Sequence, residues 1–548
     1  MAPGADGCAR LKRTEKRSRS DAIQGCPDTP SQGWTDVRIR TSVTAGAALL
    51  LLSVPAAAQA PAWAAVRGGM YVDADGSVRD ADRDYEQSID HQDAHVWRTF
   101  REMSIGLAAL SVGYWLGMDR KVADFSYERF DESVWRADNN SLIVNFALHP
   151  LGGGLAYSWS RAYHHGVWGA AAYGFLSQAV WEGVLEFNRK GSVNDVAVTP
   201  TAGIPLGEFM HKLGVYLDSA QGPSTMTQVA QWSLGTATQV DRWLDDRETT
   251  APGARDSLGF STRMWHAFRL GGEVHELRGA AGSRKLLGRA EVAGRLVSIP
   301  GYLRPGHFDR TFWRADVTSA EVTFEGSEHW VGGSLAADTL LLGQHVQHID
   351  GNASYRRGYA VTSGVSLAMS YLDSEAARVL EKYSAVHLPG PGLDFHAFLP
   401  ITNLNVSARA SFDYAGVGVL DASEIWDLRY PWERGKSILI HGGYLYAWGG
   451  SGRVSARLQV GPLLLRGSLL AGRYRSIEGW DKWPEKITVD APGGTELLRY
   501  RASAGIKPHG SPITIGVSTE ARRWRSWLAR IHRRATVESM GLAVMAEF

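Results

Sequence analysis

One histidine and two glutamates in the first half of the chain have the residue types of an acid–base site. His149 precedes Pro150, and Glu182 and Glu186 lie four residues apart in an apolar run. On a helix, that spacing puts both carboxylates on one face. Carboxylates near an imidazole can work as general acid and base when apolar walls push their pKa values apart. We therefore take His149, Glu182 and Glu186 as candidate catalytic residues.

Further polar residues interrupt the same apolar half of the chain. Asn145, Tyr157 and Arg161 lie at multiples of four residues from one another and from His149, so a continuous helix would present these four as one slowly drifting stripe. Pro150 and the glycines at 152–154 predict a helix break that presents the ring of His149. Ser192 and Asp195 have the types and spacing of a helix cap. The candidate binding or structural network consists of Asn145, Tyr157, Arg161, Asn194, Asp195, Thr199, Glu208 and His211.

Three interpretations of these residues stay open. In a catalytic site acting on lipid or lipopolysaccharide, a glutamate would be the base and His149 its acid or base partner. Asn145 or Arg161 would then stabilise an oxyanion. In a structural network, buried charged side chains would satisfy one another and determine how the helices pack. The chain contains neither Gly-x-Ser-x-Gly nor His-Glu-x-x-His, and a network of this size must be paired whatever its use, so the structural interpretation is favoured.

The third interpretation is a divalent metal site. Carboxylates and imidazoles are ligand types that suit zinc or magnesium. Their spacing in this chain matches no strong metal motif. We therefore predict no cofactor, and keep a divalent metal as the alternative. Its candidate ligands are His149, Glu182, Glu186, Asp195, Glu208 and His211.

A series of short motifs extends across residues of about 95–220. In order, they are Asn145-x-x-x-His149-Pro150, Gly154-x-x-Tyr157, Arg161, Trp181-Glu182-x-x-x-Glu186, Ser192-x-Asn194-Asp195, Thr199-Pro200, Gly203 and Gly207-Glu208. In combination they resemble domain-of-unknown-function family 3943, a bacterial envelope family without an assigned activity. The resemblance implies an envelope protein and supplies no reaction.

Two apolar stretches in this half of the chain predict helices. They cover residues 103–118 and 166–181, and the first is flanked by charged residues on both sides. Each is shorter than the ~20 residues that a helix needs to span a bilayer. We interpret them as core helices of a compact domain, or as helices that plug or cap a barrel. A stretch at 247–257 has the composition of a linker.

Alternation of apolar and polar residues replaces the helical patterns beyond about residue 250. The clearest strand runs from Leu404 to Tyr414, with an apolar residue at every even position. Residues 365–371, 438–448 and 513–517 alternate in the same way. Strands with one apolar and one polar face are typical of transmembrane barrels, and we count about twelve, within a range of ten to fourteen. A soluble sandwich is the alternative.

The last eleven residues are the strongest indication of location. Met540, Leu542, Val544 and Ala546 alternate with small or polar residues, and the chain ends on Phe548. Period two indicates a strand with one face in apolar surroundings. A terminal strand of this kind, ending on an aromatic residue behind a secretion signal, resembles the closing strand of bacterial outer-membrane barrels.

The N-terminal region predicts secretion. Residues 37–60 combine basic residues, a short apolar stretch and the sequence Ala58-x-Ala60, which are the parts of a signal peptide. Residues 1–36 are polar and basic, so we expect a misplaced start codon and translation from near Val37. Cys8 and Cys26 are the only cysteines, and both would be removed. The mature protein would then have no disulfide and no thiol chemistry.

Composition and charge narrow the class of protein further. Without residues 1–60 the chain keeps 50 basic and 52 acidic residues, a net charge of −2. That balance argues against nucleic acid as a partner. The 20 Trp, 19 Tyr and 61 Gly residues suit a barrel with aromatic girdles and closely packed strands.

A basic cluster precedes the terminal strand, with Trp524 and Trp527 interleaved. If the last strand ends in the periplasm, the hairpin before it faces the outside. Arginine forks match the phosphates of lipopolysaccharide there. A solvated hairpin tip is the alternative. The candidate lipopolysaccharide contacts are Arg522, Arg523, Arg525 and Arg530.

Together these patterns predict an α+β membrane protein in the outer membrane of a Gram-negative bacterium. A helical domain at 90–245, in the periplasm or the barrel lumen, would precede an antiparallel transmembrane β-barrel of about twelve strands at 255–548. The expected role is envelope maintenance through lipid handling or transport. A lipid-modifying hydrolase or acyltransferase is the alternative. The expected partners are outer-membrane lipid or lipopolysaccharide and the barrel assembly machinery.

Overall fold

The structure is a computed structural model, and it leaves several segments undescribed. It describes residues 69–73, 76–88, 94–117, 135–136, 140–185, 191–220, 223–245, 255, 259–278, 284–327, 330–351, 355–376, 379–429, 438–477, 492–508 and 510–548. Several predictions lie outside these residues. They are the leader and signal peptide at 1–60 with both cysteines, the candidate Glu186, and all of the linker at 247–257 except Arg255.

The described helices lie mainly in the first half of the chain. They are α2 (Ala81–Ser88), α3 (Val96–Gly117), α4 (His149–Ala162), α5 (Val167–Val180), α6 (Val193–Asp218), α7 (Thr225–Leu234), α8 (Thr236–Asp245), α9 (Ala422–Arg429) and α10 (Ile438–His441). Two π-helical turns join them, η4 (Val144–Leu148) before α4 and η5 (Trp181–Leu185) after α5. The stretches predicted at 103–118 and 166–181 fall within α3 and α5 with small changes at their ends.

The described strands lie mainly in the second half. Short strands are β1 (Met70–Val72), β2 (Val78–Asp80), β3 (Trp135–Arg136), β4 (Gly191–Ser192) and β7 (Gly306–Phe312). The long strands are β5 (Trp265–Arg278), β6 (Arg284–Val297), β8 (Val317–Ser327), β9 (Trp330–Gly351), β10 (Arg356–Ala376), β11 (Val379–Leu399), β12 (Thr402–Val417), β13 (Leu445–Val460), β14 (Leu463–Ser476), β15 (Gly493–Ile506), β16 (Ile513–Leu528) and β17 (Ile531–Glu547).

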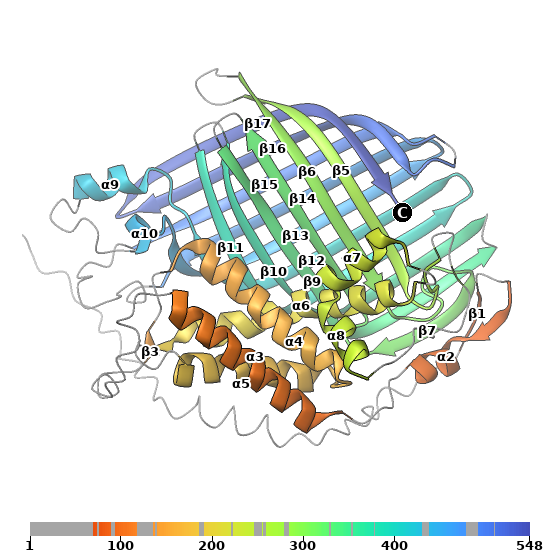
Figure 1. Ribbon diagram of the computed structural model, residues 1–548. Helices are drawn as coiled ribbons and strands as arrows, with labels where there is room; N and C mark the ends of the chain where they lie inside the picture. Colours follow the sequence, from red (N-terminus) through yellow and green to blue (C-terminus); the bar gives the residue numbers. More distant parts are fainter. Residues whose placement is uncertain are drawn as a thin grey trace, which may run out of the picture. The chain divides into compact units, whose positions relative to one another are not determined.

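The long strands close into a barrel. Each pairs antiparallel with the next along the chain, β6 pairs with β8, and the terminal strand β17 pairs with both β16 and β5 (Figure 1). Within the described residues this makes a closed antiparallel barrel of twelve strands, as the sequence predicts. Closure leaves every long strand with two neighbours, so no unpaired edge remains along the wall.

The register separates an inner from an outer face. Arg522 on β16 forms ion pairs with Glu325 on β8 and Glu381 on β11, strands that are not its neighbours. Such contacts are only made across the lumen, so Arg522 points inward and the residues beside it point outward. On β17, Leu542 is 70% exposed on the outer face. An apolar outer face around a charged interior is the pattern of an outer-membrane barrel.

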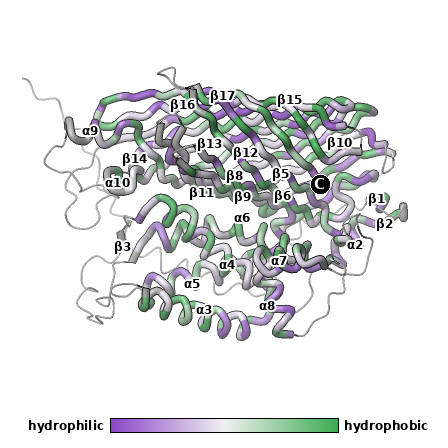
Figure 2. The backbone as a smooth tube through the Cα atoms, turned by 45° about the horizontal axis from the view of Figure 1, so that its top comes forward, coloured by the Kyte–Doolittle hydropathy of each residue, from purple (hydrophilic) through white to green (hydrophobic). Residues whose placement is uncertain are grey.

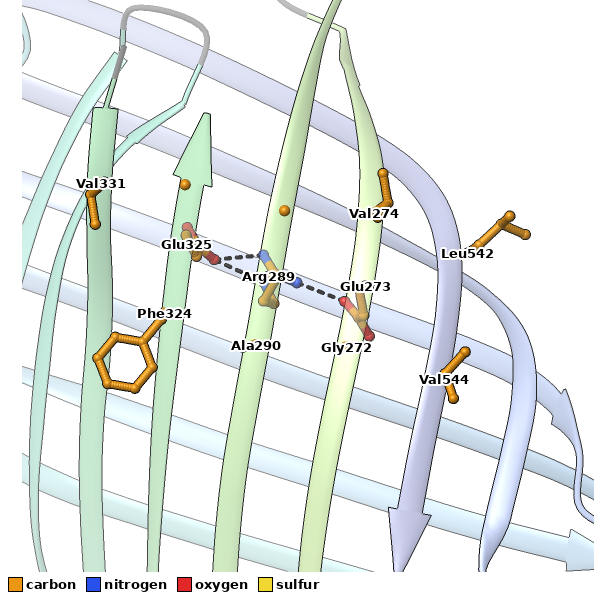
Figure 3. Close-up of a pocket in the computed structure, with 12 residues that line it drawn as sticks. Gly272, Glu273, Val274, Arg289, Ala290, Phe324, Glu325, Val331, Leu542 and Val544 are labelled. Carbon is orange, nitrogen blue, oxygen red and sulfur yellow. Dashed lines mark hydrogen bonds and ion pairs between the residues drawn. The ribbon is translucent and has the colours of Figure 1, made fainter. Parts of the chain in front are cut away.

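Side chains from the strands fill the interior. Near one end, Arg289 lies between Glu273, Glu325 and Glu520, and its side chain is 1% exposed (Figure 3). A second cluster joins Arg409 to carboxylates of two strands, and a third is built around Asp413. At these levels the lumen is therefore occupied by ion pairs of the wall itself. A plug or cap formed by helices was one of the interpretations that the sequence left open.

Helix α6 lies against the outer face of this wall. Val198, Ala202 and Leu206 pack in one cluster with outward residues of the strands, among them Met369 and Tyr414. Towards the C-terminal end of α6, the ring of Tyr216 lies tilted against that of Phe268 of β5, with centroids 5.4 Å apart. Helix α4 then packs on α6, so the layers are strand wall, α6, and the remaining helices (Figure 2). These contacts do not place α6 inside the lumen.

One strand prediction differs from the structure. The alternation at 438–448 predicts one strand, but Ile438–His441 is the short helix α10, and β13 begins only at Leu445. Gly443, with φ +71°, allows the turn between them. Among the described residues, no helix is both long and apolar enough to cross a membrane.

Candidate functional site

A histidine–aspartate pair lies where two helices begin. His149 is the first residue of α4, and Asp195 lies in the first turn of α6. His149 Nδ1 is 2.8 Å from Asp195 Oδ1. The aspartate side chain is 4% exposed and the histidine side chain 28% exposed. A buried carboxylate that holds one ring nitrogen fixes the orientation of the imidazole.

A chain of hydrogen bonds connects this pair to Glu182. The backbone N–H of Asp195 donates to Ser192 Oγ, the cap of α6, and Ser192 Oγ donates to Asn194 Oδ1 at 2.7 Å. Asn194 also donates to Asp195. The backbone N–H of Ser192 donates to Glu182 Oε2 at 3.0 Å, and Gln178 donates to the other oxygen. The predicted cap is present, and His149 and Glu182 belong to one network without touching directly.

The two π-helical turns flank this network. Turn η4 ends next to His149, and η5 contains Glu182. Single π-helical turns inside α-helices occur frequently at functional sites. The break predicted at Pro150 was wrong, because the N–H of His149 bonds to Val144 O five residues back and α4 continues through the glycines. The wider turn accommodates a proline, which has no N–H to donate.

The four residues of the predicted stripe do not share one site. His149 contacts Asp195, Asn145 contacts two tyrosines, and Tyr157 and Arg161 contact Glu208. Asn145 does not face the His149 pair, because its side-chain amide donates to Tyr444 at 3.0 Å and to Tyr446 at 2.8 Å. Tyr446 lies on β13 and Tyr444 directly precedes that strand, so Asn145 connects η4 to the barrel wall. The π-helical turn changes the rotation per residue, and a ladder drawn with ordinary helix geometry therefore fails there.

Tyr157 and Arg161 form a second cluster around Glu208. Tyr157 donates to Glu208 Oε2 at 2.8 Å, and Arg161 Nε donates to the same oxygen at 2.9 Å. Lys212, one turn further along α6, lies 3.5 Å from Oε1 and donates to the carbonyl of Ala315 between β7 and β8. The sequence analysis missed Lys212. Its position four residues after Glu208 was the available signal.

Electrostatics favour the charged form of Glu208. Burial raises the pKa of this carboxyl, but the neighbouring charges of Arg161 and Lys212 outweigh it and hold the pKa at about 2. Burial also lowers the pKa of Lys212, which Glu208 partly offsets. A buried pair with this many partners determines how α4, α6 and the wall fit together.

Glu208→Gln is expected to remove an acid-sensitive part of the stability. The folded pKa of about 2 lies below the ordinary value of 4.5, so the charged carboxyl contributes stability above pH 4.5 and loses it as pH falls towards 2. Linkage makes this contribution roughly 3 kcal/mol. Unfolding followed by circular dichroism should show a gap between wild type and Glu208→Gln that shrinks on acidification. A gap independent of pH would contradict this role, and Asp218→Asn on the same helix is the control.

Thr199 and His211 are hydrogen-bonded to neither of these two clusters in the part of the chain that the structure describes. Thr199 lies inside α6 and caps nothing, and its buried hydroxyl has no hydrogen-bond partner among the described residues. The same holds for Nδ1 of His211. His149, Glu182 and Asp195 belong to one cluster and Glu208 to another. Within the described residues, no three His, Cys, Asp or Glu side chains are grouped to hold a metal ion.

Most of the predicted arginine cluster lies on a strand, and only Arg530 lies at the hairpin tip. Residues 513–528 form β16, and the turn to β17 consists of Ala529 and Arg530, both with positive φ. The prediction of a lipid contact was wrong for Arg522, which is 3% exposed inside the lumen. Arg523 and Arg525 point the opposite way and are exposed, as is Arg530 in the turn.

Comparisons with known proteins bear on both parts of the chain. Residues 134–236 match the family model described as "Domain of unknown function (DUF3943)", which confirms the resemblance of the motifs. No curated protein matches the chain. Among solved structures, the translocator domain of autotransporter NalP from Neisseria meningitidis is similar at 10% identity and TM-score 0.17, over 59% of this chain and 98% of that one. The outer membrane channel DcaP of Acinetobacter baumannii is similar at 12% identity and TM-score 0.20, over 54% and 100%.

Neither likeness bears on what this chain binds or transports. The closure of the barrel, its apolar outer face and its charged interior are the features of an outer-membrane barrel. The protein is an outer-membrane β-barrel with a helical region, and residues 134–236 of that region match the model of a domain of unknown function.

Proposed function

We propose that the protein handles lipid at the outward wall of its barrel, as part of envelope maintenance. The observation that carries this proposal is the docking of α6 on the outer face, beside the surface that meets the bilayer. A helical domain in this position stays at the outer membrane and meets lipid directly. The closed barrel suits insertion by the barrel assembly machinery.

The surface of the helical domain supports a lipid role. Large apolar side chains are exposed along α3, α4 and α5, where a domain in water would present polar ones. They also continue across η4. They include Ile105, Leu110, Leu116, Leu148, Leu151, Leu155 and Trp168, with exposed fractions from 39% to 81%.

The outer wall of the barrel has a matching hollow. Its volume is about 710 Å³, and its rim is apolar, with Val274, Phe324, Val331 and Leu542 among the lining residues (Figure 3). Glycines at 272, 288 and 326 contribute no side chain to the lining, which makes room for a chain lying along the wall. An acyl chain has the shape and polarity that this hollow accepts.

The filled interior of the barrel favours the outer face of the wall as the surface that binds lipid. Arg289, Glu325, Glu520 and Arg522 are each at most 3% exposed and bridge strands across the barrel. Moving a solute through this level would separate buried ion pairs, at several kcal/mol each. A diffusion pore for bulk solutes fits this interior poorly.

An enzyme is the second candidate, favoured by the His149–Asp195 pair. The imidazole would act as general base or acid on an ester or amide of a lipid, and Asp195 would orient it. Glu182 would support the cap that carries Asp195, through the backbone of Ser192. In this interpretation the reaction is that of a hydrolase or acyltransferase.

The first test compares envelope lipids of a deletion strain after complementation. We expect the deletion to change the lipid profile measured by mass spectrometry, and wild type and the control Asp218→Asn to restore it. An unchanged profile in the deletion strain contradicts lipid handling. Asp195→Asn and Glu182→Gln then separate the two candidates. If a chemically altered lipid returns with wild type but with neither variant, at equal barrel levels, the protein is an enzyme.

A further inference from the structure

A row of charged residues crosses the outer face of four neighbouring strands. Directly paired residues share a face, and the register joins Arg473 on β14 to Glu496 on β15, to Arg525 on β16 and to Arg534 on β17. The row points outward, because Arg522 on the same strand points into the lumen. Arg473 is 78% exposed, and its Nε lies 3.3 Å from Glu496.

Two more arginines extend this row above and below. Arg475 is the next outward residue on β14, and Arg523 is the next on β16. Both are exposed. We call the set the outer arginine patch. It contains five arginines, Arg473, Arg475, Arg523, Arg525 and Arg534, against the single carboxylate of Glu496, a net charge of +4.

A hollow lies beside the patch. Its volume is about 640 Å³, and Arg473, Arg523 and Arg525 line it together with Ala471 and Leu498. Gly450 and Gly452 form part of the lining, where outward side chains would otherwise fill the space. Cationic forks and an apolar floor thus occur within one depression of the wall.

Moving along the strands from the patch, the outer face next carries a row with Leu469, Tyr500 and Ala521 and, on β17, the exposed carboxylate of Glu538. Beyond that row the outer face is apolar, with Leu465, Val517 and Leu542 37% to 70% exposed. This is the surface that meets the hydrocarbon layer. The patch therefore lies at the border of that layer, at the height of lipid headgroups and their phosphates.

The patch is at the end of the barrel opposite Phe548. The longest connection between neighbouring barrel strands, 418–444, is at that same end, together with 477–492 and the two-residue turn 529–530. The other end has the connection 298–316, which contains β7, and the two-residue turns 400–401 and 461–462. Outer-membrane barrels have short periplasmic turns and longer loops outside. The headgroups at the patch are therefore those of the outer leaflet.

We propose that the outer arginine patch is a binding site for the phosphorylated headgroup of lipopolysaccharide. The guanidinium forks would bind the phosphates bidentately, and the hollow would accept the adjoining part of an acyl chain. A site of this kind holds a particular lipid beside the barrel wall. It lies apart from the helical domain and does not rest on the function proposed there.

The test uses the full-length protein in detergent micelles, with diphosphoryl lipid A as the probe. The triple variant Arg473→Gln, Arg523→Gln, Arg525→Gln is expected to bind about 100-fold more weakly than wild type, from the usual contribution of each arginine near an anionic lipid. The matched control removes three exposed arginines elsewhere, Arg83→Gln, Arg101→Gln and Arg357→Gln. Its affinity is expected to stay unchanged.

A second variant changes the affinity in the opposite direction and does not depend on the triple variant folding. Glu496→Gln removes the one carboxylate of the row, so it is expected to tighten binding of lipid A by about fivefold. Equal affinity of wild type, Glu496→Gln and the triple variant would overturn the site. Phosphatidylglycerol or dephosphorylated lipid A binding as tightly as diphosphoryl lipid A would also overturn it. Failure here leaves the lipid profile of the deletion strain as a separate question.

Discussion

Replacing Arg522 by glutamine is expected to lower the unfolding free energy of the barrel by about 3–5 kcal/mol, because it leaves buried carboxylates without their cation. Arg522 binds Glu325 at 2.7 Å, Glu381 at 2.9 Å and Glu520 at 3.0 Å. Glu325 and Glu520 keep Arg289 as a second partner. Glu381 has no other ion-pair partner among the described residues. The substitution therefore leaves its buried carboxylate without a neutralising charge.

The adjacent residue supplies the control for this experiment. Arg523→Gln removes the same side chain one position along β16, where it points outward and is exposed. Urea unfolding in lipid vesicles, followed by tryptophan fluorescence, measures both variants. Exposed charges contribute at most about 1 kcal/mol, so Arg523→Gln should stay close to wild type. Equal midpoints for the two variants would contradict the ion-pair core.

The second large effect is expected at the crossing of α4 and α6. A Cβ atom on Gly153 would lie 2.3 Å from the backbone oxygen of Thr199, which cannot move aside like a side chain. A Cβ on Gly203 would lie 2.6 Å from the backbone of Gly153. Gly153→Ala should therefore push the two helices apart, and we expect a loss of about 2–3 kcal/mol from overpacking.

Gly152→Ala is a control one residue away on the same helix. Its Cβ would meet nothing within 4 Å. Alanine favours a helix over glycine by about 1 kcal/mol, so this variant should be neutral or more stable than wild type. Thermal unfolding followed by helical circular dichroism should show a lower midpoint for Gly153→Ala and an equal or higher midpoint for Gly152→Ala. A higher midpoint for both would mean that helix propensity, and not the crossing, determines the result.

The barrel could be predicted from the sequence because strand patterns are local. The apolar residues from Leu404 to Tyr414 and from Met540 to Ala546 do face outward, since period two follows directly from strand geometry. The same alternation puts Arg522 on the inner face of β16 and Arg523 on its outer face. The sequence analysis treated the arginines as one basic cluster, although alternation would have divided them into an inner and an outer set.

The site in the helical domain was harder to predict, because long-range partners decide it. Asp195 was recognised as a network residue, but its pairing with His149 depends on α6 beginning beside α4. Tyr444 and Tyr446, which bind Asn145, are about three hundred positions away in the chain. The π-helical turns add a second difficulty, because they change the spacing on which helix ladders depend.

The docking of α6 on the wall has a consequence for the life of the protein before it reaches the membrane. Val198, Ala202 and Leu206 are covered by strands that come later in the chain. Until those strands have closed, this side of α6 has nothing to pack on, and Asn145 lacks the tyrosines that hold it. The helical domain therefore acquires its final packing only on a finished barrel. A chain in transit would lack this packing, and on the function proposed above it could handle lipid only after its barrel has closed.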